Sequence, residues 1–112
     1  MVERTRTRIL DRTYSALAHP VRRGLLELLR TGPERVTDLA AQFDVSLAAT
    51  SKHIQVLESA GLITRTISGR DHRIAPEFQQ LAEAGRWIDT YQSFWESRLD
   101  ALDAHLRRGS RR

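Results

Sequence analysis

VTDLAAQFDVSLAATSKHIQVLESAG, residues 36–61, predicts two short helices joined by a tight turn. The first helix is expected over 37–43, where three apolar residues recur at the spacing of one helical face: Leu39, Ala40 and Phe43. The next two residues interrupt this pattern. Ser46 then resembles an N-cap, because its side-chain oxygen can accept a hydrogen bond from an unpaired backbone N–H.

The second helix, expected over 46–60, has two contrasting faces. The residues that would pack inward are Ala49, Thr50, His53, Ile54 and Leu57. The outward residues are small or polar apart from one leucine: Leu47, Ala48, Ser51, Lys52 and Gln55. Small side chains at an exposed helix start allow close approach to a DNA major groove, where serine, lysine and glutamine reach phosphates and base edges. Residues 37–60 are therefore predicted to be a helix-turn-helix that reads DNA.

Length and charge limit the class of protein. The chain has 112 residues, of which 40% are hydrophobic and 29% charged, so we expect one domain over 1–112. Lysine and arginine number 18 against 14 acidic residues, giving a net charge of +4. Two copies would carry twice +4, or +8, which favours a polyanionic partner. The only lysine, Lys52, stands on the predicted recognition helix.

Several functions are disfavoured by what the sequence lacks. With no cysteine there can be no disulfide or thiolate metal site. No signal peptide and no apolar run of about 18 residues is evident, so we expect a cytoplasmic protein with no membrane partner. The four histidines are scattered outside any catalytic motif, and no glycine-rich phosphate loop is present. We therefore expect no enzymatic activity and no cofactor.

Two helices are predicted before residue 36. The first ends by Ala18, because Pro20 disfavours a helical conformation at the residue before it. Pro20 can open the next helix, which would expose Arg22, Arg23 and Arg30 and end at Gly32. Residues 1–5 and 109–112 are expected to be loose ends.

A β-hairpin, or wing, is predicted over 62–75. Residues 62–67 alternate and are β-branched, 68–71 have turn chemistry, and 72–75 can return as a second strand. The hairpin carries Arg65, Arg70 and Arg73, which suit a minor groove or flanking phosphates. The alternative is a solvated hairpin whose charges discourage edge pairing.

The C-terminal segment, about 77–108, predicts one long helix with an apolar stripe. The stripe consists of Leu81, Ala84, Ile88, Tyr91, Trp95, Leu99, Leu102 and Leu106, and Trp87 and Phe94 widen it. A small winged body cannot cover so broad a face, so we expect a second copy to do so. The predicted dimer contacts are Leu10, Tyr14, Ile88, Tyr91, Trp95, Leu99, Leu102 and Leu106. The four aromatic residues between 87 and 95 suit either this seam or a small-molecule pocket.

The fold class is thus mostly α with a small β-hairpin: a winged helix-turn-helix whose N- and C-terminal helices form the dimer interface. ALAHPVRRGLLELL, the segment from Val36 to Ile63, and the hairpin together resemble the ArsR family of bacterial repressors, over about 16–75. The resemblance implies a homodimer that represses by covering a promoter and is released by an effector. It matches Ser46, Ser51, Lys52 and Gln55 to DNA-facing positions. Leu47 stands where the family usually has a polar residue, and we expect it to contact a thymine methyl.

The resemblance also bears on metal sensing. Many members of the family bind metals through a cysteine-containing helix, but 36–41 offers no thiol. Asp100, Asp103 and His105 mimic half of another family site, and without further ligands we interpret them as exposed polar residues. The aromatic last helix resembles a cysteine-free branch, which leaves an unidentified small-molecule or protein effector open.

The sequence therefore predicts a homodimeric repressor that binds an imperfect palindromic operator in double-stranded DNA. The predicted DNA contacts are Thr37, Ser46, Leu47, Ala48, Ser51, Lys52, Gln55, Arg65, Arg70 and Arg73. The alternative is a protein-interaction module that uses the aromatic C-terminal helix to hold a different protein.

Overall fold

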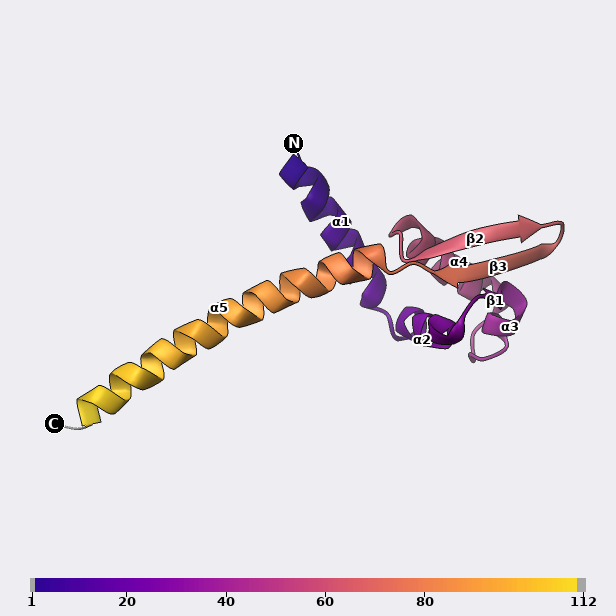
Figure 1. Ribbon diagram of the computed structural model, residues 1–112. Coiled ribbons are helices and arrows are strands. Elements are labelled where there is room, and N and C mark those ends of the chain that lie inside the picture. The colour runs from indigo at the N-terminus through magenta and orange to yellow at the C-terminus, as the bar shows by residue number, and fades with distance from the viewer. Residues whose placement is uncertain (1, 111–112) are drawn as a thin grey trace.

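The computed structural model describes residues 2–110, with residues 1, 111 and 112 outside it. The elements in chain order are α1 (Val2–Leu17), α2 (Pro20–Leu28), the 3-10 helix η1 (Leu29–Thr31), β1 (Glu34–Arg35), α3 (Val36–Ala40), α4 (Leu47–Ser59), β2 (Ile63–Ser68), β3 (Asp71–Pro76) and α5 (Gln79–Ser110). Figure 1 shows a winged body at one end and α5 projecting far from it at the other. The chain is a winged helix-turn-helix, as predicted.

The two ends of the chain are more helical than predicted. Helix α1 already begins at Val2, and α5 continues to Ser110. The expectation of loose ends is therefore wrong for the described residues, while its part at 1, 111 and 112 lies outside them. Residues 2–17 contain no glycine or proline, and arginine and glutamate are good helix formers, so nothing stops α1 short.

The corner between α1 and α2 is held by side chains that bond to the backbone. His19 caps α2, its Nδ1 accepting a hydrogen bond from the Val21 N–H at 3.2 Å. Arg22 donates from Nε to the Ala16 carbonyl at 2.7 Å, and Arg23 donates to the Leu17 carbonyl, also at 2.7 Å. Arg22 is half-buried, so the prediction that it faces solvent is wrong. It satisfies carbonyls that the end of α1 leaves without helical partners.

The first helix of the helix-turn-helix is shorter than predicted. Helix α3 ends at Ala40, and residues 41–46 form the turn that precedes α4. Phe43 lies in this turn, half-buried against the core. Its apolar side chain therefore reflects packing on the core and not a continuation of the helix. A Cβ added at Gly24 would come within 2.8 Å of the Phe43 ring, which explains the glycine in α2.

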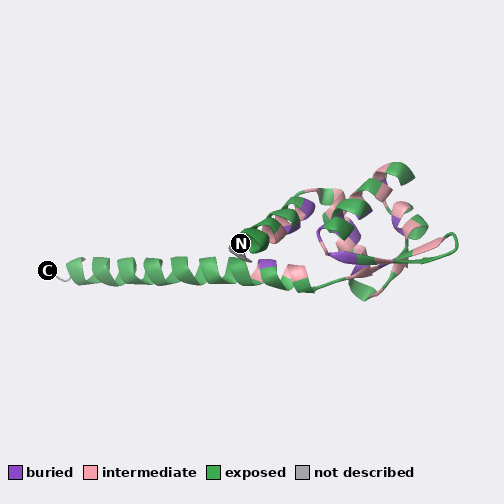
Figure 2. Cartoon of the chain, turned by 90° about the horizontal axis from the view of Figure 1, so that it is seen from above, coloured by how far each residue is buried: buried purple, intermediate pink, exposed green. Residues whose placement is uncertain are grey.

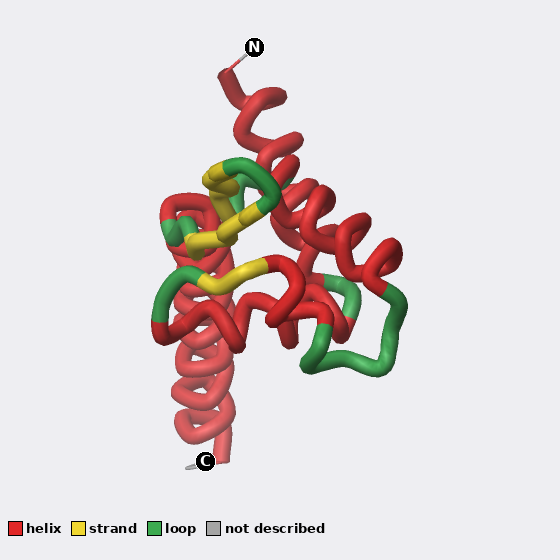
Figure 3. The backbone as a smooth tube through the Cα atoms, turned by 90° about the vertical axis from the view of Figure 1, so that its right-hand side faces the viewer, coloured by secondary structure: helices red, strands yellow, loops and turns green. Residues whose placement is uncertain are grey.

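The core lies among α1, α2, η1, the helix-turn-helix and the sheet. The fully buried side chains are Leu25, Leu29, Leu39, Ile54, Leu57, Leu62, Ile74, Thr13 and Thr50. They come from six helices and strands and from the residue before β2. The packing of the recognition helix and the formation of the wing therefore depend on the same core. Figure 3 shows the strands grouped together beside the helices of the body.

The sheet has an extra strand that the sequence did not predict. Its order is β1-β3-β2, and both pairings are antiparallel. In the hairpin Ser68 pairs with Asp71, so the turn consists of Gly69 and Arg70, shorter than the predicted 68–71. Gly69 has φ 62°, a left-handed conformation that suits glycine. Strand β1 joins the hairpin to the start of α3.

Gly61 ends the recognition helix and aims the chain into β2. Its φ is 76°, and the N–H groups of Gly61 and Leu62 bond to the carbonyls of Glu58 and Leu57, each at 3.0 Å. This is a Schellman motif, in which two N–H groups just beyond the helix satisfy carbonyls of its last turn. The predicted left-handed cap is confirmed.

We expect Gly61→Ala to lower the free energy of unfolding by about 1–2 kcal/mol, because a Cβ disfavours the left-handed conformation. The matched control is Gly85→Ala within α5, where an added Cβ meets nothing within 4 Å. That change should raise stability by roughly 0.5–1 kcal/mol through helix propensity. Urea unfolding of both variants measures the difference, and effects of the same sign would contradict the assignment.

Helix α5 packs on the body only at its start. The Tyr14 hydroxyl donates to the Ala84 carbonyl at 2.7 Å, and the Tyr14 and Trp87 rings meet edge to face at 6.1 Å. Residues 86–109 are all exposed (Figure 2). The Cα radius of gyration is 20.0 Å, against about 13 Å for a compact chain of this length. The projecting helix accounts for the difference.

Candidate nucleic-acid interface

The start of α4 is held rigidly. The Ser46 Oγ accepts a hydrogen bond from the Ala49 N–H at 3.0 Å, as the N-cap prediction requires. Thr50 is fully buried and donates from Oγ1 to the Ser46 carbonyl at 3.0 Å. Because both bonds tie the first turn together, the side chains after Ser46 project from a fixed backbone. Ala48 is exposed, and Leu47 is 53% exposed.

A cavity of about 270 Å³ lies between the helix-turn-helix and the wing. Its lining residues are Arg35, Val36, Thr37, Leu47, Ser51, Arg65, Arg70, Asp71 and His72. Five of the predicted DNA contacts therefore meet here, contributed by α3, α4 and the hairpin. Arg35 and His72 were missed, because their position depends on the pairing of β1 and β2 with β3, which local sequence patterns do not reveal.

Arg65 braces the wing on the recognition helix. Its guanidinium lies 3.1 Å from His72 Nδ1 and 3.5 Å from a Glu58 carboxylate oxygen. The side chain is only 18% exposed. Arg65 thus already has partners in the free chain, and its contact with DNA stays a prediction.

Arg70 and Arg73 occupy different parts of the wing. Arg73 pairs across the sheet with Thr66, so it lies on the opposite face from Arg65, and it bonds to Asp71 at 3.1 Å. Asp71 also pairs with Arg35 at 3.3 Å. Arg70 sits in the turn, exposed, and makes no hydrogen bond or ion pair with the described residues. The wing arginines do not form one row.

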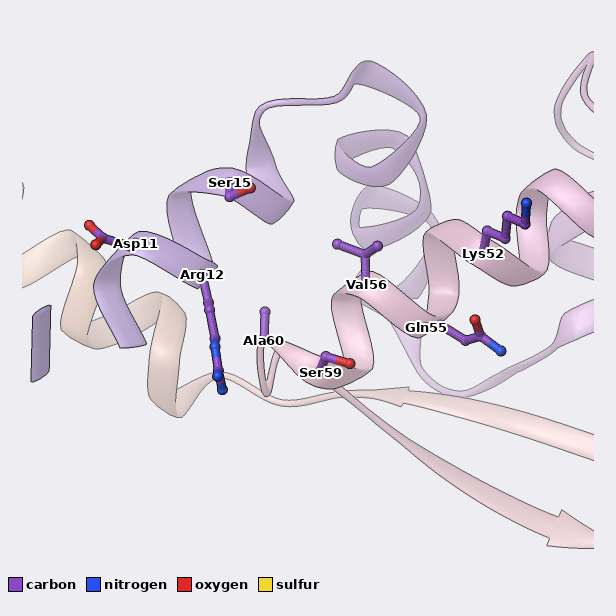
Figure 4. Close-up of a pocket in the computed structure, with 8 residues that line it drawn as sticks. All are labelled: Asp11, Arg12, Ser15, Lys52, Gln55, Val56, Ser59 and Ala60. Carbon is purple, nitrogen blue, oxygen red and sulfur yellow. The ribbon is translucent and has the colours of Figure 1, made fainter. Parts of the chain in front are cut away.

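A second and larger hollow flanks α4 on the side of α1 (Figure 4). This α1–α4 groove has a volume of about 960 Å³ and is lined by Asp11, Arg12, Ser15, Lys52, Gln55, Val56, Ser59 and Ala60. Lys52 and Gln55 were predicted to face DNA, and both are exposed. The α1 residues of the groove were missed, since their neighbourhood with α4 arises only on folding. Ser46, Ala48 and Arg73 line neither hollow.

Known proteins share this arrangement of helices and strands. A family model described as a helix-turn-helix domain matches residues 17–66. A crystal structure of an ArsR family transcriptional regulator is 36% identical, with a TM-score of 0.78, and the match covers 81% of this chain and 94% of that one. The chain belongs to the ArsR family.

Curated relatives of this ArsR family chain are matched over shorter stretches. The HTH-type transcriptional regulator Rv2034 of Mycobacterium tuberculosis is 43% identical over 47% of this chain and 50% of its own length. The transcriptional repressor SdpR of Bacillus subtilis is 31% identical over 57% of this chain and 64% of its own length. The chain thus spans half to just under two thirds of these relatives.

A cluster of ionisable side chains lies behind the recognition helix of this ArsR family chain. The His53 ring is 4.3 Å from the His19 ring, and an Arg22 guanidinium nitrogen is 3.4 Å from His53 Nδ1. The pKa of His53 is lowered from its ordinary value of 6.5, first because burial disfavours the charged ring and then because His19 and Arg22 repel a positive charge. The neutral form of His53 is therefore the one that packs against His19 and Arg22 and holds α4 in position.

This seating predicts a pH dependence. Below about pH 6.5 the unfolded chain takes up a proton at His53 that the folded chain resists, so the free energy of unfolding should fall as the pH drops. Above that value the ring is neutral in both states and contributes no slope. Urea unfolding between about pH 7.5 and 5 should show a flatter profile for His53→Gln than for the wild type. Parallel profiles would contradict this role.

The aromatic half of α5 forms a ladder in this ArsR family chain. The Trp87 and Tyr91 rings stack at 5.4 Å, Tyr91 meets Trp95 at 6.1 Å, and Arg98 lies over Phe94 at 4.9 Å. All of these rings are about half exposed. The predicted seam residues Leu99, Leu102 and Leu106 lie further along and are exposed as well, whereas Leu10 and Tyr14 are half-buried beside α5. Their contact with a second copy stays a prediction.

Within residues that the structure describes, no three His, Asp or Glu side chains are grouped so that they could hold a metal ion. Asp103 instead pairs with Arg107 at 3.2 Å on α5. In the same part of the chain, no helix combines the length and apolar character needed to cross a bilayer.

Proposed function

We propose that two copies of this chain form a homodimer that binds an imperfect palindromic operator in duplex DNA and represses transcription by covering the promoter. The observation that carries the proposal is the exposed start of α4, where small and polar side chains project from a capped helix between two hollows with arginines in their walls. Membership of the ArsR family supports a regulator, and the name of the SdpR relative supports repression.

We propose that a second copy of the chain covers the exposed apolar face of α5. Between Ile88 and Leu106 the stripe recurs at intervals of three or four residues, and these 18 residue steps make five helical turns. The stripe therefore runs straight along about 27 Å of helix, which suits another long helix. An identical helix offers the same stripe through a two-fold axis, and a face of this size left in water favours association.

The dimer would present two recognition helices to DNA. Two-fold symmetry and one helical turn of B-DNA set them about 34 Å apart, so the half-sites should repeat as an inverted pair. Ser51 and Gln55 are assigned to base edges and Lys52 to phosphate, while Arg70 and Arg73 grip the flanking backbone. Such a regulator works on the chromosome, so the proposal implies a cytoplasmic location. It assigns binding rather than catalysis, and an effector, small molecule or protein, would release the DNA.

Selection of bound duplexes from a random library, read at two salt concentrations, tests the proposal. We expect enrichment of an imperfect palindrome with half-sites about 10 bp apart, and weaker binding at the higher salt concentration. Retention of no sequence over random competitor would refute it. If the same protein formed a heteromeric complex instead, the function would be that of a protein-interaction module built on α5.

A further inference from the structure

We infer that α1 is a further part of the DNA interface, and that the α1–α4 groove seats the sugar-phosphate backbone of the operator. Arg12 is the central contact, and Arg8 and Arg4 extend it along α1. The inference rests on the proposed function, because it adds a second wall to the surface that α4 presents. It assigns a role to basic residues of α1 that a helix-turn-helix and wing leave unused.

The first argument is the make-up of the groove. One wall is α4, which contributes Lys52 and Gln55, and the opposite wall is α1, which contributes Arg12. Figure 4 shows the Arg12 side chain running from α1 past Ala60 at the end of α4. A DNA strand that leaves the surface of α4 on this side therefore meets a cation on each wall.

The second argument is that the side-chain charges of the groove have no partner among the described residues. Arg12 and Lys52 are exposed, and neither makes a hydrogen bond or ion pair with the residues that the structure describes. By contrast, Arg22, Arg23 and Arg65 are held by backbone carbonyls or a carboxylate. The groove thus keeps two cations free beside one carboxylate, Asp11. Free guanidinium groups bind phosphate with two parallel hydrogen bonds, which makes arginine well suited to this contact.

The third argument is the spacing along α1. Arg4, Arg8 and Arg12 recur every four residues, so they share one face and follow one another by about 6 Å along the axis. All three are exposed. Asp11 and Ser15, which also line the groove, fall on the same face, so the row of arginines continues the groove outward.

Arg6 offers a matched control, because it lies on the other side of α1. It lines a different hollow, of about 650 Å³, between α1 and the start of α5. Arg6→Gln and Arg12→Gln remove the same charge from the same helix. Only the second removes it from the α1–α4 groove.

The experiment measures binding of the selected operator duplex by full-length protein as a function of salt concentration. Arg12→Gln should lower the slope of log K against log salt by about 1.8, which is about 0.9 for each of two symmetry-related phosphate contacts, and should weaken all duplexes on the order of tenfold. Arg6→Gln should keep the wild-type slope. Thermal melting and sedimentation of each variant should match the wild type, because both side chains are exposed.

A scan of duplexes with single neutral methylphosphonate linkages then locates the contact. One position in each half-site should weaken the wild type and have no further effect on Arg12→Gln, as a double-mutant cycle requires. A wild-type slope for Arg12→Gln, or additive losses at every linkage, would overturn the inference while leaving DNA binding by α4 intact. If the wild type itself preferred no duplex, the proposed function would fail first. A loss of dimer in Arg12→Gln would overturn it as well, by placing Arg12 in the seam.

Discussion

Leu99→Glu is expected to dissociate the dimer and, with it, to abolish tight operator binding. Leu99 is 60% exposed in the single chain, and glutamate is a good helix former, so the fold of each protomer should survive. In the dimer the substitution would bury a carboxylate from each copy, at several kcal/mol per ion. The dimer dissociation constant should therefore rise by about 100-fold or more, as measured by sedimentation at several concentrations.

Ser97→Glu is the matched control for this effect. It adds the same charge two residues earlier, on the side of α5 that faces away from the apolar stripe. Its dimer should be as tight as the wild type's. Equal behaviour of the two variants would show that the stripe around Leu99 is not the seam, and the aromatic ladder would then be a ligand site or a surface for a different protein.

Gln55→Ala and Lys52→Ala are expected to weaken DNA binding in different ways. Glutamine can form two hydrogen bonds with an adenine edge, so its loss should relax discrimination at one base pair of each half-site by about 1–3 kcal/mol. The slope of log K against log salt should stay unchanged. Lysine contacts phosphate as a point charge, so Lys52→Ala should weaken all sequences similarly and lower that slope by about 1.8 for two copies.

Arg30→Ala provides the charge control, since Arg30 is exposed and lines neither hollow beside α4. It should leave both discrimination and slope as in the wild type. The variants are compared by titrating the selected operator and its single-base-pair changes at several salt concentrations. An equal fall in slope for Gln55→Ala and Lys52→Ala would contradict the assignment of one to bases and the other to phosphate.

The parts of the fold that depend on local chemistry could be predicted from sequence. Ser46 and Gly61 mark the start and the end of the recognition helix. Both could be recognised because an N-cap and a left-handed residue affect only the backbone within a few residues. The hairpin followed from β-branched alternation around a turn with Gly69. Helix α5 followed from its stripe. The expectation of a loose N-terminal end rested only on the lack of apolar spacing there. It was wrong, since α1 already begins at Val2.

The parts that depend on distant contacts could not be predicted. A two-residue strand such as β1 has no pattern of its own and exists only because β3 pairs with it. The register of the hairpin puts Arg65 and Arg73 on opposite faces, and Arg65 is then taken up by Glu58 and His72. Arg12 stands in an ordinary helical pattern, and only folding brings it to one groove with Lys52.

The central claim is that one rigid dimer presents two recognition helices to one face of DNA, a single helical turn apart. It is tested most directly by titrating the selected palindrome against the same duplex with about 5 bp inserted between its half-sites, which turns one half-site to the opposite side of the helix. The account predicts that the insertion lowers affinity to that of a single half-site, with two protomers on each intact palindrome. Equal affinity for both duplexes, or one protomer per palindrome, would contradict it.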